Sequence, residues 1–378
     1  MSKRIVFSLL VCTLLQFVMA QKLPTLAPGF PDRSSKLDVL PGFKSPPKGY
    51  GEVSFYWWLG DTLTHERITS QLEKLKDMSI TGLQINYCHT DKGGATYGLT
   101  YPSKPALFSE KWWDLFKWFV AEAKKYDMTV SLSDYTLGAA GQGWFIDEML
   151  AENPSLNGTK LESKQFDASD NKEVKVQLPK DIVSIDAFKL KDGKLQSTTG
   201  IKLQSFIKDN ELAWKSPEGQ WKIVVIYKTL VKTSFDPMNP LSGPKVVEKF
   251  FQRFEDYCPG EGGKGLNFFF SDELQFGIRG WLWNKNFAAE FQKRKGYDIL
   301  PKVNQLFVDL GPESYKIRLD YNDVLVALSE EGFFKPLYEW HTSRGMLFGC
   351  DHGGRGRDVT EFGDYFRTQR WMSGPGND

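Results

Sequence analysis

The sequence predicts an α/β fold of the (β/α)8-barrel type, incomplete in this chain and interrupted by an inserted antiparallel β subdomain. Three observations predict it. Short apolar segments alternate with amphipathic segments of helical period, several apolar segments end in an acidic residue, and a middle stretch alternates polar and apolar residues. Strands and helices in alternation favour right-handed βαβ crossovers and a parallel sheet. We expect five parallel strands, near residues 53, 82, 128, 266 and 346.

A closed barrel of this class has eight strands. The sequence ends at Asp378 in a glycine-rich segment that is typical of a loop. We therefore expect the chain to be a fragment of a longer protein, and an open five-stranded sheet is the alternative.

The first fifty residues are expected to precede the folded part. Lys3 and Arg4, the apolar run that follows and the small-residue site before Gln21 predict a secretory signal peptide over residues 1–20. The apolar run is too short for a transmembrane segment, so we expect none, and we expect the protein to be secreted, periplasmic or on the cell surface. Residues 21–50 are rich in Pro, Lys and Gly and predict an extended lead-in.

Residues 51–154 are expected to form the first part of the barrel. Apolar residues at Ile68, Leu72 and Leu75 recur at helical spacing, and Ser109 is suited to cap a second helix. The strands expected around these helices cover residues 53–58, 82–87 and 128–134.

Residues 155–232 change in character and predict the β-rich insert. Short segments that alternate apolar and polar residues, separated by Gly, Asp and Asn, are typical of antiparallel strands. They cover residues 173–178, 182–190, 201–207 and 221–227.

Residues 233–378 are expected to continue the barrel. The fourth strand ends at Glu273 and the fifth covers 346–350. Between them, the region 313–344 predicts a long helix that is kinked at Pro336, because proline lacks the N–H that an α-helix needs.

The composition narrows the class of function. The formal net charge is +1, so no global field attracts nucleic acid or an anionic membrane, and we expect no nucleic-acid partner. Aromatic residues make up 14% of the chain and include 12 Trp, which suit either a core or the apolar faces of sugar rings. After removal of the signal peptide, Cys88, Cys258 and Cys350 remain, and their spacing predicts buried free thiols in place of a disulfide scaffold.

The strongest candidates for chemistry are Asp272 and Glu273, which follow an uncharged run that begins at Phe268. In a parallel barrel, acidic residues at the carboxyl end of a strand face the active-site mouth. Cleavage of a glycosidic bond needs two carboxyl groups, and burial raises the pKa of a carboxyl group as a general acid requires. Glu273 is therefore our candidate acid. The alternative is an ion pair with a neighbouring Arg that braces the barrel.

Further candidates follow the other strands. Asp351 is a candidate second catalytic carboxylate, and Asp134 ends the third strand; either could also bind a cation or cap a loop. No close-spaced Cys/His metal motif is present in the sequence, and the metal ligands stay unknown. For the aromatic candidates, core packing is the alternative to sugar stacking. The expected substrate-binding residues are Trp57, Trp58, Asn86, Tyr87, His89, Asp134, Trp144 and His352.

Taken in order, several segments resemble glycoside hydrolase family 106, the α-L-rhamnosidases and their relatives. The segments are Tyr56–Gly60, Ile68–Tyr87, Phe108–Trp113, Gly141–Trp144, Phe270–Glu273 and Phe291–Asp298, and the likeness spans about residues 50–375. The resemblance implies a barrel hydrolase acting on glycans, with inversion, two glutamates and a calcium ion near the substrate.

One position departs from the family pattern, because Asp351 stands where a glutamate is expected. The second carboxylate is then either Asp351 or a residue beyond Asp378. We expect a carbohydrate substrate. Two hypotheses remain beside an α-L-rhamnosidase: a barrel hydrolase of another sugar specificity, and a non-catalytic carbohydrate-binding protein.

Overall fold

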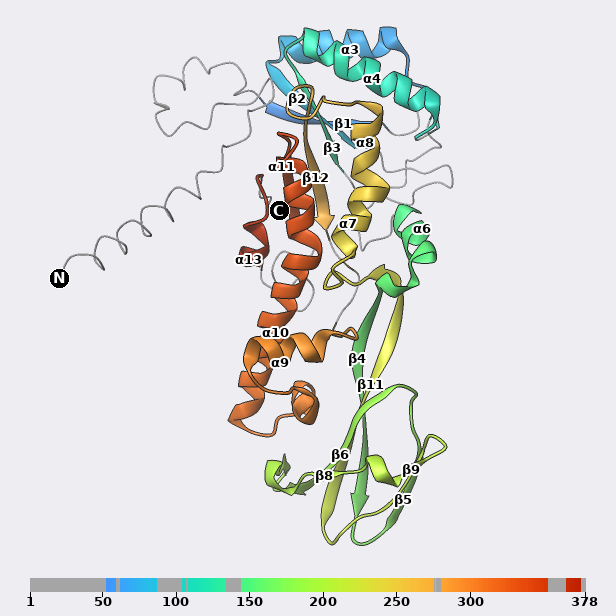
Figure 1. Ribbon diagram of the computed structural model, residues 1–378, viewed down its shortest axis with the longest axis vertical. Helices are drawn as coiled ribbons and strands as arrows, with labels where there is room; N and C mark the ends of the chain where they lie inside the picture. The colour runs from blue at the N-terminus through green and yellow to red at the C-terminus, as the bar shows by residue number, and fades with distance from the viewer. Residues whose placement is uncertain are drawn as a thin grey trace, which may run out of the picture.

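The structure is a computed structural model, and it describes residues 52–58, 62–86, 104–106, 108–133, 144–274, 276, 280–352 and 365–374. The molecule is elongated, with a parallel sheet and its helices at one end and long antiparallel strands at the other (Figure 1).

Five parallel strands form one sheet, and all five strands predicted from the sequence are confirmed. Their order in the sheet follows their order in the chain. The described strands make a curled half-barrel, so the closed eight-stranded barrel is not confirmed. The strands are β1 (Glu52–Trp57), β2 (Ile80–Asn86), β3 (Thr129–Ser133), β12 (Leu266–Leu274) and β14 (Leu347–His352).

Two strands extend further than the sequence predicted. The fourth was expected to end at Glu273, but Leu274 still pairs with β14. The fifth was expected to end before Asp351, but β14 continues to His352. The acidic residues Asp272, Glu273 and Asp351 therefore lie within the last residues of these two strands.

Helices cover one face of this sheet because each crossover returns the chain over the same side. Thr64 and Ser109 cap the first two helices. The cap at Ser109 was predicted, and its Oγ accepts a hydrogen bond from the Trp112 amide at 3.3 Å. Phe116 and Phe119 pack here in one core with the apolar residues of β2 and β3. The helices of this part are α3 (His65–Asp77), α4 (Glu110–Lys125), α6 (Trp144–Glu152), α7 (Ser242–Val246), α8 (Gln252–Tyr257) and α11 (Lys335–Thr342).

Antiparallel strands occupy the chain between α6 and α7, and one short strand from beyond β12 joins them. The long strands β4 (Asn157–Ser169) and β11 (Gln220–Phe235) pair with each other and extend away from the parallel sheet (Figure 1). A six-stranded sheet has the order β13-β4-β11-β6-β7, with β8 paired to β6, and a smaller sheet has the order β5-β10-β9. The other strands are β5 (Glu173–Gln177), β6 (Ile182–Lys191), β7 (Lys194–Leu195), β8 (Ile201–Lys202), β9 (Ile207–Lys208), β10 (Glu211–Lys215) and β13 (Trp281–Leu282).

The single strand predicted over residues 201–207 is wrong. A 3-10 turn, η3 (Gln204–Phe206), separates β8 from β9, and these two short strands join different sheets. Leu203 lies fully buried in the core that the two sheets share, just before the turn. The apolar side chain is therefore buried although its backbone is not part of a strand. The division of the chain into domains at the expected boundaries stays a prediction.

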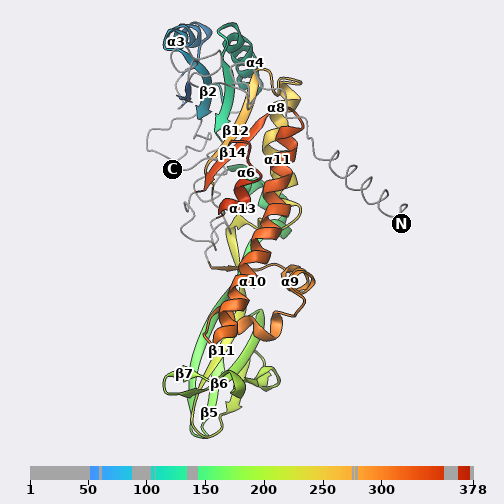
Figure 2. The ribbon, with the colours of Figure 1, turned by 90° about the vertical axis from the view of Figure 1, so that its left-hand side faces the viewer.

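A helical column joins the two ends of the molecule (Figures 1 and 2). It consists of α10 (Pro312–Ser329), the π-helix η6 (Glu330–Phe334) and α11. The kink predicted at Pro336 stays a prediction; the π-helix interrupts the α-helical pattern just before it, and Pro336 itself lies in the first turn of α11. The remaining helical elements are η1 (Pro154–Leu156), η2 (Ser197–Thr199), η4 (Val247–Phe251), α9 (Phe287–Lys295), η5 (Leu300–Leu306) and α13 (Tyr365–Gln369).

A buried carboxylate fastens α13 to the column. Glu330 is 1% exposed. Its Oε2 accepts from Arg367 at 2.8 Å, while its Oε1 accepts from Trp371 Nε1 at 3.1 Å and lies 2.6 Å from Arg370 Nε. Because each oxygen of the buried charge is paired, this cluster holds the end of the described chain against the π-helix.

His341 makes the stability of the column depend on pH. Burial lowers the pKa of His341 to about 3, from its ordinary value of 6.5. Between these two pH values the unfolded chain binds a proton that the folded chain does not. We therefore expect the free energy of unfolding to fall below pH 6.5, with a contribution from this group of up to about 1.4 kcal/mol per pH unit. Urea titrations from pH 7 to 4 would measure this slope, and the slope should be smaller in His341→Gln. Equal slopes in the parent and the variant would contradict the assignment.

Gly332 allows the close contact between the π-helix and the loop after β11. A Cβ atom at this position would lie 2.6 Å from the Pro237 carbonyl oxygen and 2.8 Å from that of Asn239. We expect Gly332→Ala to lower the free energy of unfolding by about 1–3 kcal/mol, because backbone atoms must move apart. Gly374→Ala is the matched control, since a Cβ atom there has no neighbour within 4 Å. Denaturant titration would compare the two, and equal effects would show that the contact is not restrictive.

Candidate active site

The carboxyl edge of the parallel sheet brings most of the predicted residues onto neighbouring strands. Trp57 pairs with Asn86, Asn86 with Ser133, Ser133 with Phe270, and Phe270 with Gly349. This row crosses all five strands at the end where parallel strands deliver their functional residues. Trp57 and Asn86, predicted separately from the sequence, are thus direct neighbours in the sheet.

A β-bulge lies at the acidic pair of β12. Ser271 pairs with Cys350 and Leu274 pairs with His352, so β12 advances three residues while β14 advances two. The extra residue lies at Asp272–Glu273. Bulges of this kind change the direction of a side chain and are common beside active sites. Asp272 and Glu273 therefore do not follow the alternation of side chains between the two faces of the sheet that holds elsewhere in the strand.

On the face of the sheet opposite the helices, β2 and β3 present polar residues below this edge. Leu83, Ile85, Val130 and Leu132 belong to the core under the helices, and alternation along β2 and β3 puts their neighbours on the other face. Those neighbours include three buried polar residues, and among the described residues Gln84 Nε2, Thr129 Oγ1 and Ser131 Oγ have no hydrogen-bond partner. The interior of a barrel of this class is normally apolar. This polar floor is therefore suited to hydrogen-bonding beneath a bound polar molecule.

Trp58 packs in the core under the helices, which is the alternative to substrate binding that the sequence left open for it. It is 3% exposed, and its ring packs edge-on against Trp112 at 6.0 Å and Phe119 at 5.3 Å. Alternation explains the difference: Trp58 follows Trp57 and turns to the helix-covered side, where a large apolar ring is stabilised by burial.

The other predicted residues divide into two groups. The backbones of Asp272, Glu273, Asp351 and His352 lie in β12 and β14, and Trp144 begins α6, but the side chains of these five and of Trp57 and Asn86 lie outside the described part of the structure. Tyr87, His89 and Asp134 lie wholly outside the described residues. The structure thus brings six of the candidates to one edge by their backbones.

Sequence reasoning missed a buried acid, Asp236, which directly follows β11. Its Oδ2 accepts from Asn284 Nδ2 at 2.7 Å and its Oδ1 accepts from the Met238 amide at 2.9 Å. Burial raises the pKa of Asp236. The sequence pattern that could have identified Asp236 is the one that identified Glu273, an acidic residue at the end of an apolar strand. Both carboxylate oxygens of Asp236, however, accept hydrogen bonds that hold the loop after β11. We interpret it as a structural residue.

Other predicted features concern metals, thiols and membranes. Among the described residues, no group of three His, Cys, Asp or Glu side chains is placed to hold a metal ion. Cys258 and Cys350 are buried and are in no disulfide within the described residues, as predicted, and Cys88 lies outside those residues. Within the ranges that the structure covers, we find no helix with the length and apolarity that crossing a bilayer needs.

Comparison with known proteins agrees with this geometry. Residues 175–370, over half of the chain, match the model of glycoside hydrolase family 106, described as α-L-rhamnosidase. The solved rhamnosidase from Novosphingobium sp. PP1Y is similar to this chain with a TM-score of 0.58 and 12% identity, over 89% of this chain and 49% of that one. This chain therefore spans about half the length of that enzyme, and identity this low shows the fold alone.

More distant structural matches carry no argument of their own. The β-galactosidase from the Antarctic haloarchaeon Halorubrum lacusprofundi has a TM-score of 0.42 and 10% identity, over 85% of this chain and 39% of that one. The β-galactosidase from the psychrophilic Marinomonas ef1 has a TM-score of 0.39 with the same identity and the same coverage of each chain. A search of curated protein sequences found no match.

The placement of Trp58 leads to a stability prediction. We expect Trp58→Ala to lower the free energy of unfolding by about 3–5 kcal/mol, because the substitution leaves a cavity in the core under the helices. Phe55→Ala on the same strand is the matched control, since Phe55 is 53% exposed and should lose far less. Denaturant titration of both variants measures the difference. A loss for Trp58→Ala no larger than for Phe55→Ala would contradict its place in the core.

Proposed function

The chain belongs to glycoside hydrolase family 106, the family of the α-L-rhamnosidases, and we propose that it carries the acidic edge of an enzyme that hydrolyses terminal α-L-rhamnosyl bonds in glycans. The observation that carries the proposal is the bulged end of β12, with Asp272 and Glu273 in it, at the carboxyl edge of a curled parallel sheet. Glycosidases of this kind work with two carboxyl groups on either side of the bond that breaks.

In the proposed mechanism, Glu273 is the general acid and protonates the leaving oxygen. Asp351, on the neighbouring strand β14, is the general base that activates water on the opposite side of the sugar, and Asp272 supports the pair. Adjacent strands lie about 4.8 Å apart, and inverting enzymes hold their two carboxyl groups roughly 6.5–9.5 Å apart. Retaining enzymes hold them only about 5–5.5 Å apart, so the strand spacing alone does not choose between the two courses, and inversion is proposed from the resemblance. A second carboxylate beyond Asp378 is the alternative for the base.

The substrate is proposed to lie across the row of strand ends. Trp57 would offer an apolar face to the sugar ring, and Asn86 would hydrogen-bond to its hydroxyl groups. The polar floor of Gln84 and Ser131 supports binding of a hydroxyl-rich molecule at this end of the sheet. The other residues assigned to the substrate on position alone are Tyr87, His89, Asp134, Trp144 and His352.

Two further parts of the proposal rest on resemblance and on the N-terminal sequence. Calcium is proposed as an ion near the substrate, and since no ligand set is found in the described part of the chain, no step of the mechanism is assigned to it. Export is proposed from the signal-like residues 1–20, which lie outside the described residues.

The test is hydrolysis by the full-length gene product and its Glu273→Gln variant. We expect the variant to lose about 10²–10⁴-fold in kcat on rhamnose-containing polysaccharide, because a general acid contributes about this much. The loss should be smaller on p-nitrophenyl α-L-rhamnoside, whose leaving group needs little protonation. Glu211→Gln, an exposed glutamate on β10, is the control and should keep full activity.

The same assay separates the parts of the proposal. Unchanged activity in Glu273→Gln would exclude it as the acid, and no release of rhamnose by the parent would exclude the substrate. NMR of the first-formed anomer reports inversion or retention, and Asp351→Asn tests the base. A chelator that leaves the rate unchanged would remove calcium from the proposal.

A further inference from the structure

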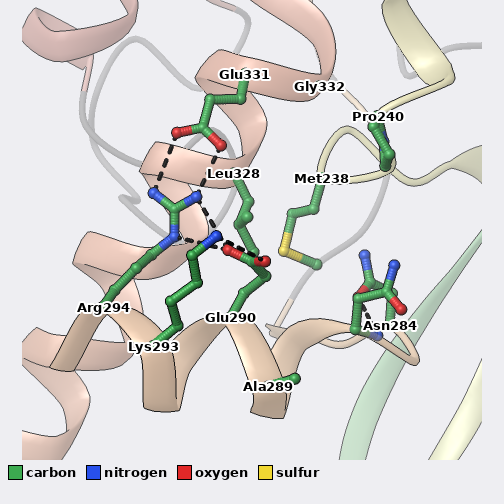
Figure 3. Close-up of a pocket in the computed structure, with 11 residues that line it drawn as sticks. Met238, Pro240, Asn284, Ala289, Glu290, Lys293, Arg294, Leu328, Glu331 and Gly332 are labelled. Carbon is green, nitrogen blue, oxygen red and sulfur yellow. Dashed lines mark hydrogen bonds and ion pairs between the residues drawn. The ribbon is translucent and has the colours of Figure 1, made fainter. Parts of the chain in front are cut away.

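A pocket with both apolar and polar walls lies away from the strand ends, beside α9. It has a volume of about 320 Å³, is open to solvent on one side and is bordered by α9, the π-helix and the loop after β11 (Figure 3). None of the residues proposed for catalysis lines it. Its size is at the lower end of the range for small-molecule sites, which is about 300–1,000 Å³.

The charged wall of the pocket is internally balanced. Arg294 donates to both carboxylate oxygens of Glu331, at 3.1 and 2.7 Å, and also to Glu290 at 3.2 Å. Lys293 lies 3.7 Å from Glu290 with 75% of its side chain exposed. Two cations therefore face two anions, and the guanidinium of Arg294 is already held by two carboxylates. An anionic ligand would have to break these pairs, so the wall favours a neutral ligand that both donates and accepts hydrogen bonds.

The opposite wall carries two amide side chains, of which one is held in a fixed orientation. Asn284 donates through Nδ2 to the buried Asp236, and its Oδ1 accepts from the Asn286 amide at 3.0 Å. The side chain of Asn286 makes no capping bond to α9 and is exposed beside the pocket. One amide is thus anchored to the protein, and the next has its donors and acceptor directed to solvent.

Apolar side chains complete the pocket. Met238 and Leu328 approach from the loop after β11 and from α10, and both are at least nine-tenths buried (Figure 3). Their apolar surface lies between the charged wall and the amide wall. A molecule with an apolar face and a rim of hydroxyl groups matches this arrangement. A purely apolar ligand would displace water from the charged side chains without replacing the hydrogen bonds to that water, which is unfavourable.

We propose that this pocket binds one neutral sugar ring of a glycan, separately from the carboxyl edge of the sheet. The neutral polyol follows from the pocket itself, and the choice of a glycan as its source rests on the proposed function. The chain connects the two places: Phe276, two residues after β12, packs on Phe235 and Phe333 at 5.3 and 5.0 Å, and these neighbour the segments that border the pocket. A glycan held here would be kept close to the enzyme while another of its residues is cleaved.

The test is a binding titration of the full-length protein with methyl α-L-rhamnoside, methyl α-D-glucoside and D-galacturonate, followed by saturation-transfer NMR. Ala289→Trp fills the pocket from an exposed position on α9 without removing any polar contact. We expect it to remove one site for the neutral glycosides, or to weaken that site at least about tenfold. Asn286→Ala should weaken the same site. Lys285→Trp, an exposed neighbour outside the pocket, is the control and should change nothing.

The outcomes separate this proposal from the proposed function. If the parent hydrolyses rhamnoside and Ala289→Trp binds sugars as the parent does, the pocket proposal is overturned and the enzyme assignment stands. If the parent shows no hydrolysis but loses a sugar site in Ala289→Trp, the pocket stands and the enzyme assignment falls. No sugar binding by the parent, or a preference for galacturonate at the site that Ala289→Trp removes, would overturn the pocket proposal. Thermal unfolding of each variant verifies that it is folded.

Discussion

The parallel pairing of β12 with β3 on one side and β14 on the other is the constraint on which the rest of the structure depends. It holds the acidic pair at the same edge as Trp57 and Asn86, although more than 180 residues separate these parts of the chain. Because Ser271 and Leu274 on either side of the acids both pair with β14, the bulge that carries the acids is held at both ends by paired backbone. A site built on strands holds its geometry more tightly than one built on loops.

The bulge in β12 and the π-helix after α10 both depart from regular backbone geometry, and each positions particular residues. The bulge gives β12 one residue more than β14 at the acids. The π-helix brings Gly332 against the loop after β11, and it also presents Glu330 to Arg367 and Trp371. Both irregularities cost regular hydrogen bonds locally, and both occur where segments distant in sequence meet.

Much of the fold was predictable from the sequence because its signals are local. Apolar runs identified all five parallel strands, and Ser109 identified a helix cap. Where prediction failed, tertiary packing overrode the local pattern: residues 201–207 look like one strand but separate into β8 and β9, because Leu203 is buried at a turn between two sheets. The long strand β4 was not recognised at all, since its residues alternate only weakly and gain their order from pairing with β11.

For the candidate site, the sequence by itself determined which residues carry the chemistry: an acidic pair after an apolar run, and an order of motifs that resembles one family. It determined this because residue type and local period are properties of the chain alone. Only the tertiary structure decided that Trp57 meets Asn86 while Trp58 faces the core, that Asp236 is structural, and that a charge-balanced pocket forms beside α9. Register, burial and the meeting of distant segments depend on which strands and helices pair, and no local pattern carries that information.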